Sequence, residues 1–259
     1  MNSLSKILSR IMIVVTVMAI ATLGGCKFYT KEDLSEYTKR RLKEEYGEEF
    51  EIKTVIDGRH TIAYPIKNPE LLFETTYVIS NGNGHNQYIQ ETVAFQYKKL
   101  IIEKFKDFQY NFHVDVDISW TELTRANPNI TISEYDKLTN GIPQNIPRYA
   151  IYISCDALEK TDEYLFDFLE SIAYIHDCSF NVYFVTNEDL AAFKEYYTTY
   201  PQLSGSTYQL LEKYTWFEKE FPNYKFATLY SNVTKGEWDM DYEKFIIKMK
   251  EVRSNELYR

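Results

Sequence analysis

Hydrophobic residues recur with a helical period in some stretches of the chain and with a strand period in others. One face of a predicted helix that ends at Gly47 carries Leu34, Tyr37, Thr38, Leu42 and Tyr46. From Phe50 onward, apolar and polar residues alternate, as in a half-buried strand. In the first half of the chain these patterns predict a helix over 31–46, strands over 50–56, 59–66 and 71–80, a long helix over 87–106 and a strand over 110–120.

The second half follows a polar segment, residues 121–147, which contains prolines and a short predicted helix over 133–139. A strand, a helix and a strand then follow within one crossover length, which predicts a parallel β-α-β unit. The predicted elements here are strands over 149–154, 180–186 and 224–231 and helices over 161–175, 187–197, 206–220 and 242–253.

The expected fold class is α+β. An N-terminal subdomain, residues 31–120, has the order α-β-β-β-α-β, with an antiparallel meander covered by the long helix. Asp57-Gly58 between the first two strands is a dipeptide that fits a type I′ hairpin turn. Residues 121–147 are the expected linker, and residues 148–259 form a smaller α/β subdomain.

The first 26 residues have a different character. Lys6 and Arg10 precede an uncharged apolar run that ends at small residues. This run is shorter than the about 20 apolar residues that span a bilayer, so a cleaved signal peptide over residues 1–25 is favoured. Leu23-Gly24-Gly25-Cys26 resembles the lipobox of bacterial lipoproteins, which implies lipidation of Cys26 and cleavage just before it. An uncleaved anchor helix and an ordinary secretory signal are the alternatives.

The lipobox resemblance implies an extracytoplasmic protein held on the cell membrane by the two acyl chains, such as palmitate, of a diacylglyceryl group. Each buried methylene contributes about 0.8 kcal/mol, so two chains anchor stably where one does not. Residues 26–30 would be a short tether. Lys27 gives no inner-membrane retention signal, which favours the outer face of a single-membrane cell.

The body also resembles known proteins at the level of pattern. A leading helix ending in Tyr46-Gly47, then Phe50, Ile52, a hairpin and a long helix from near Tyr88, is similar to the body of many small lipoproteins of single-membrane bacteria. Those proteins lack an assigned activity. The resemblance covers about residues 30–112 and carries no catalytic residues.

Composition narrows the range of partners. The chain has 29 basic and 38 acidic residues, and loss of Lys6 and Arg10 with the signal leaves a net charge of about −11. Phosphates would be repelled, so nucleic acid is excluded as a partner.

Cys155 and Cys178 flank one predicted helix, which places both near the same end of it. The sequence leaves two alternatives open for this pair, a disulfide and two buried thiols.

His113, Asp115 and Asp117 form the stretch that most suggests chemistry. They lie on one face of the predicted strand, with neighbours about 7 Å apart. This spacing suits the carboxyl pair of an inverting glycosidase, and imidazole with carboxylates can hold a divalent metal. Carboxylates at this spacing on an open sheet are more typical of a solvated face, which is the interpretation that we favour.

Other polar clusters match binding motifs poorly. Asn81-Gly82-Asn83-Gly84 precedes a helix, but it lacks the third glycine and the β-α-β frame of a dinucleotide site, so a turn is expected. Glu44, Glu45, Glu48, Glu49 and Glu51 do not have the spacing of an EF-hand, so a solvated face is expected there too.

The remaining histidines, His60, His85 and His176, lie far apart and have no zinc-site spacing. His176 is also poorly placed to activate Cys178 as a nucleophile. The sequence thus predicts no cofactor, no metal and no catalytic residue, and it specifies no oligomeric state.

Three functional hypotheses follow. The favoured one is a non-enzymatic lipoprotein that recognises a protein, a peptide or another envelope component. The second is a surface hydrolase of glycan or peptide that uses Asp115 and Asp117. The third is a small solute-binding component, which requires a cleft at the junction formed by residues 121–147.

Overall fold

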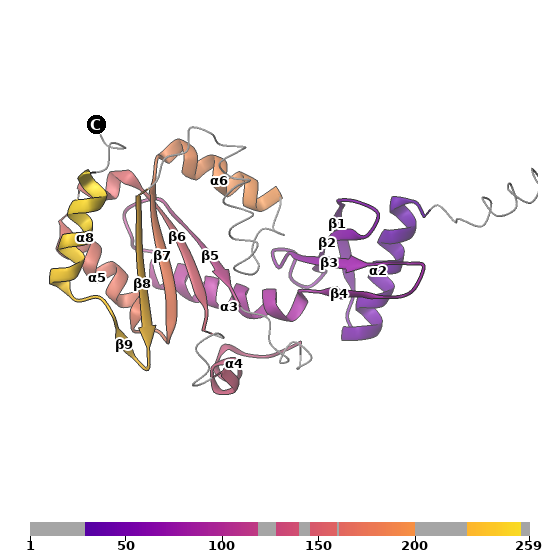
Figure 1. Cartoon of the computed structure of the whole chain (residues 1–259). Coiled ribbons are helices and arrows are strands. Elements are labelled where there is room, and N and C mark those ends of the chain that lie inside the picture. The colour runs from indigo at the N-terminus through magenta and orange to yellow at the C-terminus, as the bar shows by residue number, and fades with distance from the viewer. Residues whose placement is uncertain (1–28, 119–127, 140–145, 160, 200–226, 255–259) are drawn as a thin grey trace, which may run out of the picture.

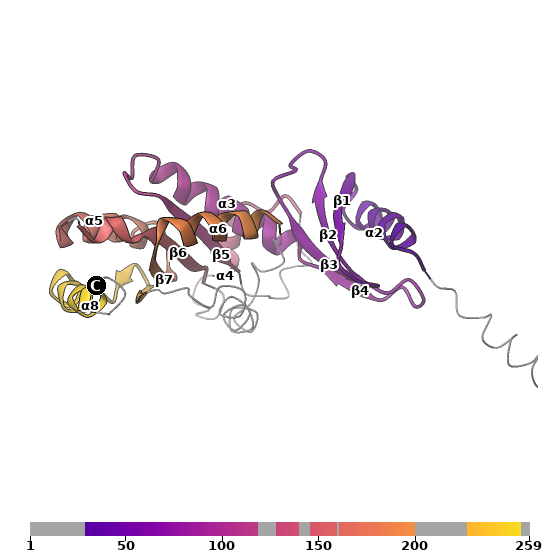
Figure 2. The same ribbon diagram turned by 90° about the horizontal axis from the view of Figure 1, so that it is seen from above.

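The structure is a computed structural model that describes residues 29–118, 128–139, 146–159, 161–199 and 227–254. Within these residues the chain forms two β-sheets that lie side by side (Figure 1). Helix α2 lies at one end of the molecule and helix α8 at the other, in both Figure 1 and the view from above in Figure 2. The α+β class predicted from the sequence is confirmed.

Helix α2 (Lys31–Tyr46) begins at a capping box. The Thr30 hydroxyl accepts a hydrogen bond from the Asp33 amide at 3.1 Å, and the Asp33 carboxylate accepts one from the Thr30 amide at 2.8 Å. The helix ends at Gly47, whose φ of 73° is left-handed and whose amide donates to the Lys43 carbonyl. Within the predicted stripe, Leu34, Thr38 and Leu42 are buried, and Tyr37 and Tyr46 are half-buried.

Four antiparallel strands form the first sheet, in the order β1 (Phe50–Val55), β2 (His60–Pro65), β3 (Phe73–Tyr77) and β4 (Gly84–Asn86). The β1–β2 connection is not the expected type I′ turn, because Gly58 lacks the positive φ which that turn requires. Instead, the Asp57 carboxylate accepts hydrogen bonds from the backbone amides of Arg59 and His60, each at 2.9 Å.

The turn at Asn81–Gly84 joins β3 to β4, a short strand that the sequence pattern did not predict. The Val78 amide donates to the Asn83 carbonyl at 2.8 Å, which closes the hairpin. A Cβ atom on Gly84 would lie 2.3 Å from the Thr76 carbonyl oxygen and 2.3 Å from the Tyr77 ring. Glycine is therefore required here for the two strands to pair.

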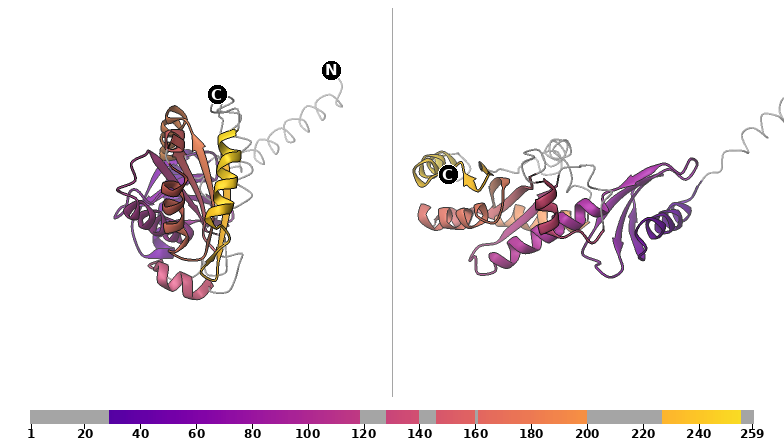
Figure 3. Two further views of the ribbon diagram at one scale, coloured as in Figure 1. Left: turned by 90° about the vertical axis from the view of Figure 1, so that its left-hand side faces the viewer. Right: turned by 90° about the horizontal axis from the view of Figure 1, so that it is seen from below.

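Helix α3 (Tyr88–Lys104) belongs to the cores of both sheets. Tyr88, in its first turn, packs in the apolar cluster of the first sheet together with Phe50 and Phe73. Val93 and Tyr97 face the larger core of the second sheet. The helix, magenta in Figure 3, runs from one sheet to the other and physically joins them.

The second sheet has five strands in the order β5 (Phe112–Asp117), β6 (Arg148–Ser154), β7 (Cys178–Val185), β8 (Ala227–Thr234) and β9 (Glu237–Trp238). β6 and β7 are parallel and α5 (Asp162–Ala173) connects them, which confirms the predicted β-α-β unit. The other neighbouring pairs are antiparallel. β5 pairs with β6, so this sheet takes a strand from each side of residues 121–147.

One face of the second sheet carries the main core, which is completed by α3, α5 and α8 (Tyr242–Ser254). The opposite face is not open, because α6 (Asn187–Thr199) packs against it. Leu190 on α6 forms a smaller cluster there with Ala150, Tyr152 and Val185. The expectation of an open sheet at this face was wrong.

Three further features bear on the sequence predictions. The short helix expected over 133–139 is α4 (Ile132–Thr139). The helix expected over 206–220 lies outside the described residues. Within the part of the chain that the structure describes, no helix is both long and apolar enough to cross a bilayer.

Cys155 and Cys178 are both free thiols. Cys155 follows the last residue of β6, whereas Cys178 is the first residue of β7, and the two strands are parallel. They therefore lie at opposite ends of these two neighbouring strands, about 25 Å apart along the strand direction, beyond the reach of a disulfide. The placement of both cysteines at one end was wrong.

Replacement of Gly84 by alanine tests the close approach of β3 and β4. We expect the free energy of unfolding to fall by about 1–3 kcal/mol, because the added methyl group meets backbone that must move. Urea unfolding followed by circular dichroism measures this change. Gly58→Ala is the matched control, since its Cβ would meet nothing within 4 Å. Equal midpoints for the two variants would contradict the observed packing.

Candidate functional site

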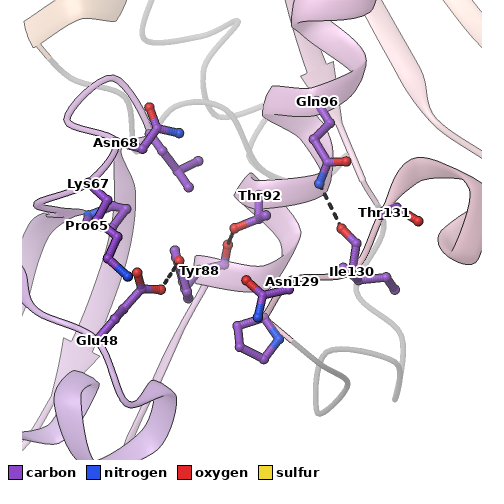
Figure 4. Close-up of a pocket in the computed structure, with 12 residues that line it drawn as sticks. Glu48, Pro65, Lys67, Asn68, Tyr88, Thr92, Gln96, Asn129, Ile130 and Thr131 are labelled. Atoms are coloured by element: carbon purple, nitrogen blue, oxygen red, sulfur yellow. Dashed lines mark hydrogen bonds between the residues drawn. The ribbon is translucent and has the colours of Figure 1, made fainter.

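A pocket of about 290 Å³ lies on α3, between the first sheet and residues 128–131. Its floor is one stripe of α3, formed by Tyr88, Thr92 and Gln96 at successive turns of the helix (Figure 4). One wall is the connection from β2 to β3, and the other is residues 128–131, just before α4. We call this site the junction pocket.

The wall on the side of the first sheet is anchored through Tyr88. Its hydroxyl donates a short hydrogen bond to the Glu48 carboxylate, while its ring packs edge-on against Phe50 with centroids 5.0 Å apart. Burial, with the carboxylate of Glu48, raises the pKa of Tyr88. The phenol therefore stays protonated and remains a donor to Glu48 at physiological pH.

Gln96 holds the opposite wall. Its side-chain nitrogen donates to the Ile130 carbonyl at 2.8 Å, and its side-chain oxygen accepts from the Ile132 amide at 3.3 Å. A single side chain thus satisfies two backbone groups at the entry to α4. Thr131 and Glu134 add a capping box there, with the Thr131 amide donating to the Glu134 carboxylate at 2.8 Å.

The pocket surface combines apolar and polar groups with little net charge. Leu71 and Ile130 are buried and contribute apolar surface. Among the lining residues, Glu48 is the acid and Lys67 the base. The arrangement offers hydrogen bonding and apolar contact, which is the usual composition of a small-molecule site.

His113, Asp115 and Asp117 do not reach the junction pocket. They alternate along β5 as predicted, but they are not a solvated face: Asp115 is 7% exposed and Asp117 is 6% exposed. Arg148 on the paired strand lies 4.0 Å from the Asp117 carboxylate. Burial also holds the pKa of His113 well below its usual value. Asp115 and Asp117 are therefore buried, and His113 is half-buried, on the face of the second sheet against which α6 packs.

The predicted solvated glutamates have defined partners in the protein. Glu45 accepts from Tyr77 and Asn86, and Glu48 accepts from Tyr88. The other glutamates of the group pair with basic side chains of α2: Glu44 with Arg40 and Arg41, Glu49 with Lys43, and Glu51 with Lys39. In the described ranges, no three histidine, cysteine or acidic residues come together as a metal site.

The histidines outside β5 lie in separate environments. His60 contacts Glu74 at 2.7 Å, and His85 is exposed on β4. His176 is largely buried, shares a hydrogen bond of 2.5 Å with the Tyr149 hydroxyl and lies against the Tyr97 ring. Burial also raises the pKa of Cys178 to about 12, which leaves no thiolate for catalysis.

Sequence patterns did not reveal the junction pocket, because its lining comes from segments between residues 48 and 131 that only the fold brings together. Tyr88, Thr92 and Gln96 recur every four residues. That spacing is visible in the sequence, but it does not indicate a pocket unless the two walls, the β2–β3 connection and residues 128–131, are also placed.

His176 provides a prediction for the dependence of stability on pH. Burial lowers its pKa from 6.5 to about 4, against the opposing effect of Asp136 and Asp177. Between these values the unfolded chain binds a proton that the folded protein does not. Stability should therefore fall as pH drops from about 6.5 to 4, by about 3 kcal/mol in total from this residue.

Urea unfolding at several pH values measures this effect. A His176→Gln variant should lose stability less steeply than the unmodified protein over this range. His85→Gln, at an exposed histidine, should keep the original slope. A slope for His176→Gln equal to that of the unmodified protein would show that His176 is not buried in its neutral form.

Comparisons with known proteins agree with the observed fold. No family model and no curated protein matches the chain. A crystal structure of a DUF5037 family protein from Ruminococcus gnavus ATCC 29149 is similar, with a TM-score of 0.57 and 18% sequence identity. The match covers 84% of this chain and 99% of that one, more than either sheet alone could account for. The chain therefore resembles that protein in its fold.

Proposed function

We propose that this chain is a non-enzymatic binding module of the bacterial cell envelope, held at the outer face of the membrane through lipidated Cys26. The junction pocket is its binding site. The single observation that carries this proposal is that pocket, one wall of which is residues 128–131. These residues belong to the segment 121–147, where a solute-binding component was expected to have its cleft. The bound species is therefore a small ligand or the exposed end of a larger envelope component.

Binding accounts for the pocket better than catalysis does. The groups that Figure 4 shows around it, such as Gln96 and Thr131, are occupied in holding its walls. The carboxyl pair of the hydrolase hypothesis, Asp115 and Asp117, is buried on β5. A hydrolase that uses this pair would need it exposed to a polymeric substrate.

The anchor proposal is supported by the lipobox resemblance and by the start of the body. Thr30 caps α2 only four residues after Cys26, so the tether spans at most about 14 Å. The first sheet would then lie next to the membrane. Figure 1 places α8 at the far end from α2, so the second sheet would extend outward, with the junction pocket between.

Metabolic labelling with an alkyne fatty acid in a single-membrane bacterium tests the anchor. The unmodified protein should be labelled and should sediment with membranes, whereas Cys26→Ser should lose both properties, because the acylated thiol is gone. Cys155→Ser is the matched control and should remain labelled. An unlabelled parent protein, or a labelled Cys26→Ser variant, would refute lipidation at this residue.

A further inference from the structure

We infer that the junction pocket binds an N-acetylated saccharide of one or two rings. The inference rests on the proposed function, because it names the class of ligand for the same site. Three properties carry it: the size of the pocket, its charge and the kinds of group that line it.

Size limits the ligand. A volume of about 290 Å³ is at the lower end of ligand sites, which commonly enclose about 300–1,000 Å³. It suits a compact ligand or the end of a chain. Because α3 forms the floor and Gln96 fixes the wall at residues 128–131, the site is shaped before a ligand arrives.

Charge favours a neutral ligand. The whole chain has a net charge of −9, yet the pocket lining contains one acid, Glu48, and one base, Lys67. The Glu48 carboxylate already accepts the Tyr88 hydroxyl, which reduces its attraction for a cation. An anionic ligand would be attracted by the Lys67 ammonium group but repelled by the net negative charge of the rest of the molecule.

The polar groups match the hydroxyl and acetamido groups of such a sugar. Asn68 lies half-buried in the wall, and its side-chain amide offers both a donor and an acceptor, as an acetamido group requires. The Thr92 hydroxyl donates to the Tyr88 carbonyl at 2.7 Å and keeps lone pairs that can accept from a sugar hydroxyl. Lys67, which is exposed at the same wall, can donate to another.

Apolar groups in the pocket match the remaining part of the ligand. Pro128 is half-buried, whereas Pro65, Leu71 and Ile130 are buried and give the pocket only a small apolar surface. An acetyl methyl group is small enough to cover this surface. A plain polyhydroxylated sugar would leave more of it in contact with water.

Isothermal titration calorimetry with N,N′-diacetylchitobiose tests the inference on the chain from residue 27 onward. Cellobiose is the matched probe, because it has the same number of rings and the same linkage but no acetamido groups. We expect affinity of about millimolar for diacetylchitobiose and affinity at least about tenfold weaker for cellobiose. Asn68→Ala should weaken diacetylchitobiose binding about tenfold through loss of its hydrogen bonds.

Asn83→Ala, at an exposed asparagine in the β3–β4 turn, is the control and should bind as the unmodified protein does. Circular dichroism checks that each variant is folded. Equal binding of both sugars, no effect of Asn68→Ala in a folded variant, or no heat with diacetylchitobiose at millimolar concentration would overturn the inference. If trialanine bound in the pocket and diacetylchitobiose did not, the saccharide inference would be wrong, whereas the proposal that the protein is a binding module would still hold. If the fatty-acid labelling experiment found no label at Cys26, only the proposal of a lipid anchor would be wrong.

Discussion

The structure depends on the double use of helix α3. Most helices bury one apolar stripe against one core, but α3 buries Tyr88 in the cluster of the first sheet and Val93 and Tyr97 in the core of the second. Without this helix the larger core would lose one of its sides, and the smaller cluster, which α2 also covers, would lose Tyr88. Since both sheets pack on one rigid rod, the position of one relative to the other is set by α3.

The junction pocket is a consequence of this arrangement. Thr92 and Gln96 follow Tyr88 at successive turns of α3, and the three residues form the floor of the pocket. The walls are then fixed by hydrogen bonds at each side: Tyr88 to Glu48 on one, and Gln96 to Ile130 and Ile132 on the other. A site made in this way is preorganised, which favours recognition of a ligand with few contacts.

Local patterns predicted the elements of this fold well, because the periods of helices and strands are properties of a few consecutive residues. The helix expected over 31–46, the long helix expected over 87–106 and the parallel pair of β6 and β7 were all predicted correctly. The predictions that were wrong depend on contacts between residues that are distant in the sequence. Asp115 and Asp117 are buried because α6, which comes much later in the chain, packs on this face of the sheet. β5 belongs to the second sheet because it pairs with β6, which follows a long connection.

The site was less predictable than the fold for the same reason. Glu48 was expected to be one of several solvated glutamates, and only the fold brings Tyr88 to it. Gln96 is an ordinary polar position in a helical pattern until residues 130 and 132 lie against it. Contacts across such separations follow from tertiary structure, and no period in the sequence encodes them.

Hydrogen exchange monitored by mass spectrometry in increasing urea tests the central claim most directly. If α3 unites the two cores, the peptides that contain β2 and β7 should lose protection with the same free energy of opening and at the same urea concentration. Exchange of β2 at low urea while β7 stays protected would contradict the account, because the two sheets would then be independent units joined by a passive helix.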